Sequence, residues 1–144
     1  MVEQSARLWS GAVTGTASSE LLDDFFAAIE RRDLDAVAAA YADEVEVWHN
    51  VTGVALDKQA SVDLLRYWCD RVDGRSYEVL ERSEYDGGVV QRHVVRGTVD
   101  GEPLAADVCI VFHLDRGSIT RIFEYLDPAS VASVFGAVQP TDDG

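Results

Sequence analysis

Residues 86–127, DGGVVQRHVVRGTVDGEPLAADVCIVFHLDRGSITRIFEYLD, decide the fold of this chain. Its longer segments are rich in Val, Ile, Tyr and Phe, which favour β-strands. They are separated by Asp86-Gly87-Gly88, Asp100-Gly101 and Asp115-Arg116-Gly117, which are typical of tight hairpin turns. Together with the residues just before Asp86, the stretch predicts four long strands joined as an antiparallel meander.

The residues before this meander predict three helices. The first follows a cap at Ser18 or Ser19, and the second starts after Asp33 and carries Tyr41 near its end. The third runs from about Asp57 to Val72, with its apolar residues on one broad face, and is followed by Gly74 as its stop.

A change of period marks the first strand, because residues 45–49 (VEVWH) alternate between apolar and polar side chains. Beyond the meander, Pro128 closes the sheet region and residues 129–135 predict a short terminal helix. The expected fold class is α+β: three N-terminal helices packed on a curled antiparallel or mixed sheet, forming a cone with an apolar pocket. We expect a single domain over residues 18–136, between flexible segments at 1–17 and 137–144.

Composition excludes several classes of partner. A formal charge of −14 disfavours binding to nucleic acid or to an anionic membrane. No stretch predicts a secretory signal or a membrane span, and Cys69 and Cys109 match no disulfide framework or zinc-site spacing. These features predict a cytoplasmic protein without a cofactor or metal.

Three motifs resemble the ketosteroid-isomerase-like and SnoaL-like families of the nuclear transport factor 2 superfamily. Residues 41–47 (YADEVEV) look like a helix-to-strand joint of ketosteroid isomerases, and residues 100–108 (DGEPLAADV) are similar to their central hairpin. Residues 117–127 (GSITRIFEYLD) resemble the last strand of SnoaL-like domains and limonene-epoxide hydrolases. The resemblance covers roughly residues 19–135 and implies a cone-shaped fold that encloses a pocket.

The residues at the family's site positions depart from those of the isomerases. The resemblance puts Phe25 and Ile110 at the two hydrogen-bond donor positions of the isomerase site and His49 at the position of the general base. Because Phe and Ile cannot donate a hydrogen bond, isomerisation of a steroid by that mechanism is disfavoured.

The epoxide-hydrolase positions retain more polar chemistry. There the resemblance puts Gln91 and His93 on an Arg-x-Asp motif and Glu124 on the second aspartate. Strand alternation then turns Gln91, His93 and Glu124 inward, and it turns Arg92, Cys109 and His113 outward. We expect His93, Glu124 and His49 to be catalytic: His93 is the candidate base, Glu124 is either its orienting partner or the acid, and His49 is either a second proton carrier or a structural residue. The expected substrate-binding residues are Gln91, Asn50, Trp48, Phe25, Trp68, Ile110, Phe112 and Leu126.

These expectations define a cofactor-independent acid–base enzyme, acting as an isomerase, dehydratase, cyclase or hydrolase on a small hydrophobic molecule such as a polyketide, terpenoid or steroid-like compound. Two alternatives remain. One is a non-catalytic domain that binds a small molecule or dimerises, with Phe123 and Tyr125 on an outer sheet face that forms a homodimer. The other is a metal site made by His49, His93 and Glu124.

Overall fold

The computed structural model describes residues 15–136 of the chain. The expected flexible segments at 1–17 and 137–144 lie outside these residues, apart from positions 15–17. In chain order the elements are α2 (Ala17–Glu30), α3 (Leu34–Ala40), β1 (Tyr41–His49), β2 (Ala55–Leu56), α4 (Lys58–Arg71), β3 (Asp73–Tyr85), β4 (Gly88–Val99), β5 (Glu102–Asp115), β6 (Ser118–Leu126), the 3-10 helix η1 (Pro128–Val131) and α5 (Ala132–Phe135).

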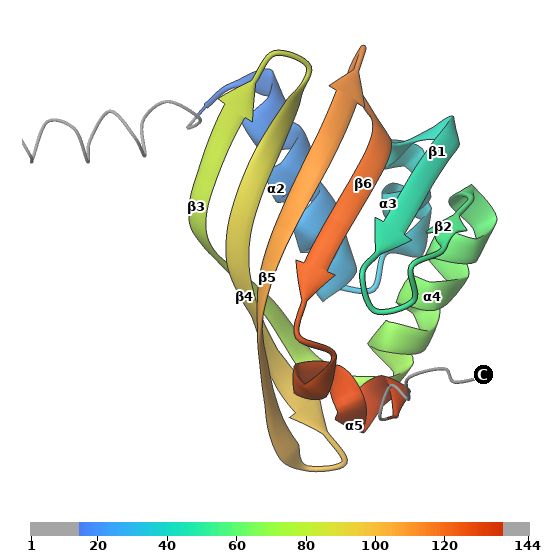
Figure 1. Ribbon diagram of the computed structural model, residues 1–144, viewed down its shortest axis with the longest axis vertical. Helices are drawn as coiled ribbons and strands as arrows, with labels where there is room; N and C mark the ends of the chain where they lie inside the picture. The colour runs from blue at the N-terminus through green and yellow to red at the C-terminus, as the bar shows by residue number, and fades with distance from the viewer. Residues whose placement is uncertain (1–14, 137–144) are drawn as a thin grey trace, which may run out of the picture.

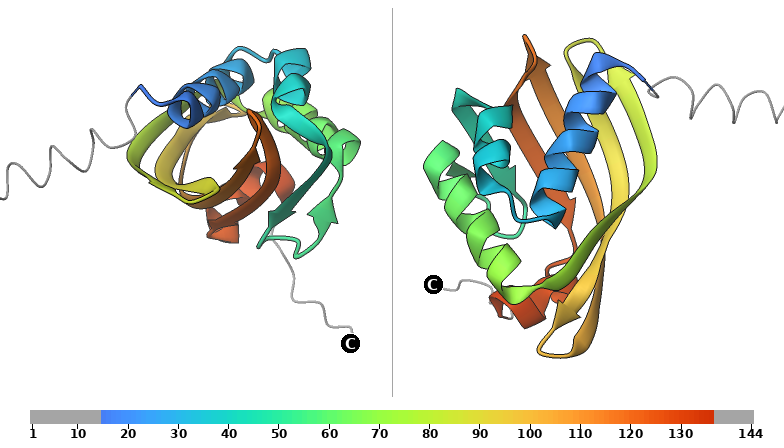
Figure 2. Two further views of the ribbon diagram at one scale, coloured as in Figure 1. Left: turned by 90° about the horizontal axis from the view of Figure 1, so that it is seen from above. Right: turned by 180° about the vertical axis from the view of Figure 1, so that it is seen from behind.

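The strands form one curled sheet of six, in the order β2-β1-β6-β5-β4-β3 (Figure 1). β3 to β6 are the predicted antiparallel meander, while β1 lies parallel to β6 at the far side of the sheet. This parallel pair joins the first strand to the last and makes the sheet mixed. Figure 2 shows the sheet curling beside the helices without closing into a barrel. The expected α+β class is confirmed.

The predicted hairpin turns are present, and their backbone explains the residue choice. Asp100 and Gly101 have φ angles of 52° and 83°, and Arg116 and Gly117 have φ angles of 53° and 79°. Two consecutive left-handed residues match the twist of the flanking strands, and glycine adopts this conformation without a steric penalty. The short turns place β4, β5 and β6 directly beside one another.

Asp33 and Asp57 cap α3 and α4, but the cap of α2 differs from the expectation. The Ser19 N–H donates to Oγ1 of Thr16 at 3.0 Å, so Thr16 is the cap instead of Ser18 or Ser19. The Asp33 and Asp57 carboxylates accept from the N–H groups of Ala36 and Ala60.

Two other boundaries were predicted wrongly. Tyr41 begins β1 instead of ending α3, and Gly74 lies inside β3 instead of stopping α4. Tyr41 is buried, and its hydroxyl lies 2.9 Å from Oγ of Ser61 on α4, so tertiary packing outweighs its helical spacing.

The helices cover one face of the sheet, which we call the inner face; the opposite face is the outer face. Phe25 on α2 contacts the ring of Phe112, and its neighbour Phe26 contacts the ring of His93. These contacts put α2 over the centre of the meander, as Figure 2 shows from behind. The core therefore lies between the inner face and the helices.

The C-terminal segment packs against α4. The Tyr67 hydroxyl donates to the carbonyl of Val134, and Arg71 donates to the carbonyl of Ser133. Residues predicted as one short helix are divided between η1 and α5. Within residues 15–136, no helix combines the length and the apolar character needed to cross a membrane.

Candidate functional site

A row of facing residues crosses the inner face of the sheet from β3 to β1. Its members are Arg82, Gln91, Ile110, Glu124 and His49, each paired in register with the next. Four of the five side chains are polar. Beside it lies a row that is wholly apolar and buried: Val89, Phe112, Ile122 and Val47. Of these two rows, only the first carries polar side chains, and we call it the polar row.

The side chains of His49 and Glu124 meet at the β1 end of this row. Nε2 of His49 lies 3.1 Å from Oε1 of Glu124, and the two side chains are 18% and 21% exposed. Both groups keep limited access to solvent. The pair can therefore exchange protons with water while its inner side meets the core.

Asn50 fixes the spacing of the two strands next to this pair. Its side chain donates to the carbonyl of Leu126 and accepts from the N–H of the same residue, both at 3.0 Å. Its backbone N–H donates to the carbonyl of Glu124. Asn50, expected to bind substrate, is exposed and has its side-chain amide bonded to the backbone of β6.

His93 is the next residue of β4 after Gln91 that faces inward, and it lies deeper in the core than the His49–Glu124 pair. It is 1% exposed, and the rings of Phe26 and Tyr77 pack edge-on against it. Nδ1 of His93 lies 2.9 Å from Nε2 of Gln91, whereas Nε2 of His93 is buried and makes no hydrogen bond within the described part of the chain. Burial lowers the pKa of His93 to about 4, although the charge of Glu124 acts in the opposite direction. The ring is therefore neutral near pH 7.

The sequence-based expectation paired His93 with Glu124, but the structure gives each a different partner. Glu124 bonds to His49, and His93 bonds to Gln91. Both lie on the inner face, as strand alternation predicted, and the charge of Glu124 acts to raise the pKa of His93.

Arg82 anchors the β3 end of the row, and sequence reasoning missed it. Only 6% exposed, it donates from Nε to Oε1 of Gln91 and from Nη1 to Ser19 and Asp23, each at 2.8 Å. Nη2 is buried and has no hydrogen-bond partner among the residues that the structure describes. The register of β3 against β4 shifts between Val79 and Glu81, so alternation counted from Tyr77 puts Arg82 on the wrong face.

Two tyrosines also lie within reach of the charge of Glu124. Burial, with a contribution from Glu124, raises the pKa of Tyr41 to about 12 and raises the pKa of Tyr77 strongly. The Tyr77 hydroxyl accepts a hydrogen bond from Nε1 of Trp68 at 3.2 Å. Because indole can only donate, the Tyr77 hydrogen is left free for another acceptor. Tyr77 faces Val95 on β4, and its ring reaches His93 from one inward position along the strand.

The other expected pocket residues divide between the core and the outer face. Phe25, Ile110 and Phe112 are buried in the core, and Leu126 is partly buried. Trp48 instead lies on the outer face, where its ring contacts Phe123 and Tyr125. Its expected place in the pocket is wrong, because it alternates with the inward residues Val47 and His49.

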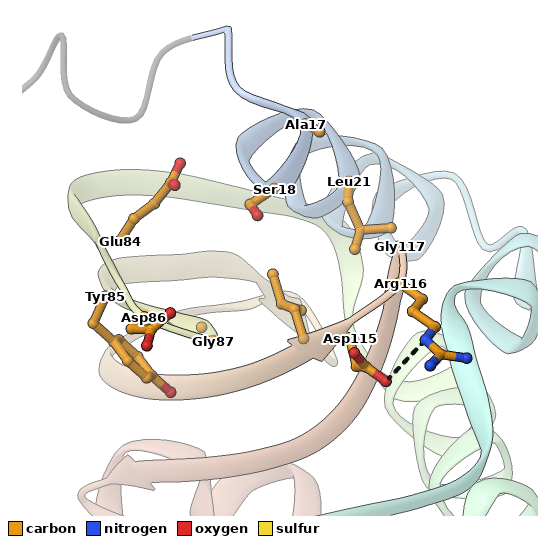
Figure 3. A pocket seen from close by; sticks show the side chains of 12 residues that line it. Ala17, Ser18, Leu21, Glu84, Tyr85, Asp86, Gly87, Asp115, Arg116 and Gly117 are labelled. Carbon is orange, nitrogen blue, oxygen red and sulfur yellow. Dashed lines mark ion pairs between the residues drawn. The ribbon is translucent and has the colours of Figure 1, made fainter.

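A separate cavity of about 310 Å³ lies at the end of the sheet where the β3–β4 and β5–β6 turns meet the start of α2 (Figure 3). Its charged lining residues are Glu84, Asp86, Asp115 and Arg116, and none of the expected site residues lines it. Residues 15–136 also contain no group of three or more His, Cys, Asp or Glu side chains placed to hold a metal ion. His49, His93 and Glu124 thus do not form the ligand set considered above.

The family follows from a match between residues 22–122 and the SnoaL-like domain. This chain belongs to the SnoaL-like domain family. The match covers α2 through most of β6, including every residue of the polar row except Glu124. The family resemblance inferred from the three motifs is confirmed.

Solved structures agree with the fold of this SnoaL-like chain. A protein with a ketosteroid-isomerase-like fold from Catenulispora acidiphila, in complex with trimethylamine, has a TM-score of 0.70 at 14% identity, covering 84% of this chain and 93% of its own. An LEH-like epoxide hydrolase from M. tuberculosis has a TM-score of 0.67 at 24% identity, with 85% and 89% covered. Wild-type IdmH from Streptomyces antibioticus has a TM-score of 0.73 at 15% identity, with 83% and 98% covered. No curated protein sequence matches the chain.

Proposed function

We propose that this SnoaL-like domain is a cofactor-independent acid–base enzyme that acts on a small, largely apolar molecule. The observation that carries the proposal is the His49–Glu124 pair on the inner face, beside the buried His93 and a wholly apolar row. Polar groups placed in an apolar setting are costly unless they are used, and perturbed titratable groups gather at functional sites. An apolar surface with few polar groups is what a small hydrophobic substrate requires.

Glu124 is the proton acceptor in this proposal. Its carboxylate takes a proton from an acidic C–H group of the substrate or from a water molecule, and His49 stabilises the charge before transfer and exchanges protons with solvent afterwards. The partial exposure of both side chains supports that exchange. This assignment moves the base from His93, where sequence analysis put it, to Glu124.

His93 has a supporting role in this proposal. A ring whose pKa is about 4 carries no charge near pH 7, so it contributes a directed hydrogen bond and not a fixed charge. Phe25 and Ile110 offer no hydrogen bond, whereas the buried His93 and the partly buried Tyr77 each have a group that can contact a substrate oxygen.

A screen for turnover tests the proposal. Wild-type protein and Glu124→Gln would be incubated with conjugated ketones, epoxides and linear polyketide analogues, and products would be followed by mass spectrometry. We expect turnover of at least one compound by the wild type and a loss of about 10²–10⁴-fold in Glu124→Gln. Turnover that is equal in both proteins contradicts the proposal.

The second candidate is a non-catalytic ligand-binding domain. It is favoured by the buried Nε2 of His93 and Nη2 of Arg82, which have no hydrogen-bond partner between residues 15 and 136 and would gain one from a ligand. Tight binding of a compound from the same screen without any conversion, unchanged in Glu124→Gln, would favour this candidate over the enzyme.

A further inference from the structure

Three buried side chains form a chain of hydrogen bonds whose direction is determined by their chemistry. Arg82 Nε lies 2.8 Å from Oε1 of Gln91, and Gln91 Nε2 lies 2.9 Å from Nδ1 of His93. Arginine has only donors, so the Gln91 atom that faces it must be the carbonyl oxygen. The Gln91 amide nitrogen therefore faces His93, and an amide nitrogen only donates.

We infer that Arg82 and Gln91 are positioning residues that hold His93 in the tautomer with its hydrogen on Nε2. Since the Gln91 amide donates to Nδ1, Nδ1 must accept and cannot carry the hydrogen. Nε2 then becomes an N–H donor. This atom is buried and has no hydrogen-bond partner among residues 15–136, so the chain of bonds ends in an unpartnered donor.

Burial keeps the ring neutral, and the two charged groups near it act in opposite directions. Arg82 on β3 opposes its protonation, whereas Glu124 on β6 favours it and is already paired with His49 on β1. α2 offers His93 only the apolar ring of Phe26, and β3 adds the ring of Tyr77. None of the partners in contact with the ring stabilises an imidazolium.

A neutral N–H donor in this place selects the chemistry of the substrate. A buried donor without a partner is destabilising, and an acceptor oxygen on a ligand removes this cost. The N–H of a neutral imidazole can polarise a carbonyl group and stabilise the negative charge that develops on its oxygen. We therefore assign carbonyl compounds as the substrate class; this assignment, unlike the tautomer, rests on the proposed function.

Nitrogen NMR of histidine-labelled protein tests the tautomer without any substrate. At pH 7 the wild type should show a protonated Nε2 and an unprotonated Nδ1 for His93. The decisive variant is Gln91→Glu, which keeps a partner for Arg82 but offers only acceptor oxygens to His93. We expect the hydrogen to appear on Nδ1 in this variant.

The matched control is Gln91→Leu, which removes both hydrogen bonds and should give a mixture of tautomers. A wild-type spectrum with Nδ1 protonated overturns the inference. So does a Gln91→Glu or Gln91→Leu spectrum identical to that of the wild type. If Gln91→Glu does not fold, the spectra of the wild type and of Gln91→Leu still test the assigned tautomer.

Titration with a cyclic ketone and with the matching hydrocarbon separates the substrate class from catalysis. We expect the ketone to shift the Nε2–H resonance of His93 downfield and the hydrocarbon to leave it in place. Equal shifts with the two compounds overturn the carbonyl assignment. A ketone-specific shift without turnover of any ketone supports the assignment and contradicts the enzymatic proposal alone.

Discussion

His49 and Glu124 occupy facing positions on the parallel strands β1 and β6, and their side chains meet with Nε2 of one 3.1 Å from Oε1 of the other. The contact depends on the pairing of β1 with β6, which places a strand that precedes the meander beside the strand that ends it. Asn50 follows His49 directly and bonds both backbone groups of Leu126. These hydrogen bonds hold β1 and β6 together next to His49 and Glu124. They favour a fixed geometry for proton transfer between the two side chains.

The first prediction concerns the coupling of this pair. Glu124→Gln and His49→Gln should each lower turnover of an identified substrate, the former by about 10²–10⁴-fold. The double variant should be little worse than Glu124→Gln, because a base and its partner act as one unit. Steady-state kinetics on the three variants measures this. Glu46→Gln, which breaks the exposed Glu46–Arg121 pair on the same two strands, is the control and should leave turnover unchanged. Losses that simply multiply would show that the two groups act independently.

The second prediction concerns stability in acid. The pKa of His93 is about 4 in the folded protein and about 6.5 in an unfolded chain, so between these values the unfolded state binds the extra proton. Stability is thus lost as pH falls from 6.5 to 4, by up to roughly 3 kcal/mol from this residue. Denaturant unfolding at pH 7 and pH 4 should show a larger loss for the wild type than for His93→Gln. Equal losses would mean that His93 titrates normally in the folded state.

The third prediction concerns the charge of Glu124. This charge raises the pKa of His93 against the larger effect of burial, and Arg82 lowers it. Glu124→Gln removes the only opposing effect among these causes, so the pKa of His93 should fall further. Proton and nitrogen NMR titrations of the two proteins measure the difference. An unchanged titration would show that Glu124 and His93 do not share one site.

Alternation along the strands made much of this site predictable. Gln91, His93 and Glu124 face inward as expected, because β4 and the end of β6 continue in regular register there. The pairing partners could not be predicted, since the parallel contact of β1 with β6 leaves no local mark in the sequence.

Irregular strands hid the rest. The register shift in β3 reverses the alternation before Arg82. Regular alternation from Tyr77 would put Arg82 on the outer face, although its side chain bonds to Gln91 on the inner face. Trp48 was misplaced for a different reason: aromatic character suggested a pocket wall, although its alternation with Val47 and His49 already indicated the outer face.

The fourth prediction concerns self-association, which we propose occurs through the outer face. A row of facing residues there carries the apolar side chains of Val90, Val111, Phe123 and Trp48. Val90 and the nearby Tyr125 are 37% and 46% exposed. Light scattering should report a dimer for the wild type and a monomer for Val90→Lys. Val54→Lys, in an exposed loop, is the control and should remain dimeric. A monomeric wild type at micromolar concentration contradicts the proposal.

Arg75 joins the ends of two helices to the start of β3. Its guanidinium donates to the carbonyls of Ile29 and Glu30 at the end of α2 and to those of Cys69 and Val72 at the end of α4. The last carbonyls of a helix lack partners within the helix, and they lie at its negative end. One cation thus donates to four acceptors, of which only Ile29 also accepts from the Arg32 N–H and the Cys69 thiol among the described residues, and it complements two helix dipoles.

The last prediction is that Arg75→Met destabilises the fold by about 3 kcal/mol or more, because it leaves four partly buried carbonyls without their charged donor. Arg75→Lys should recover part of the loss, since an ammonium group has only three donors and no planar fork. Arg116→Met is the matched control: Arg116 is 92% exposed and lies 4.0 Å from its neighbour Asp115, so its loss should change stability very little. Denaturant unfolding of the four proteins measures the differences. Equal stability of Arg75→Met and the wild type would show that water replaces the guanidinium at both helix ends and that the junction is held by apolar packing alone.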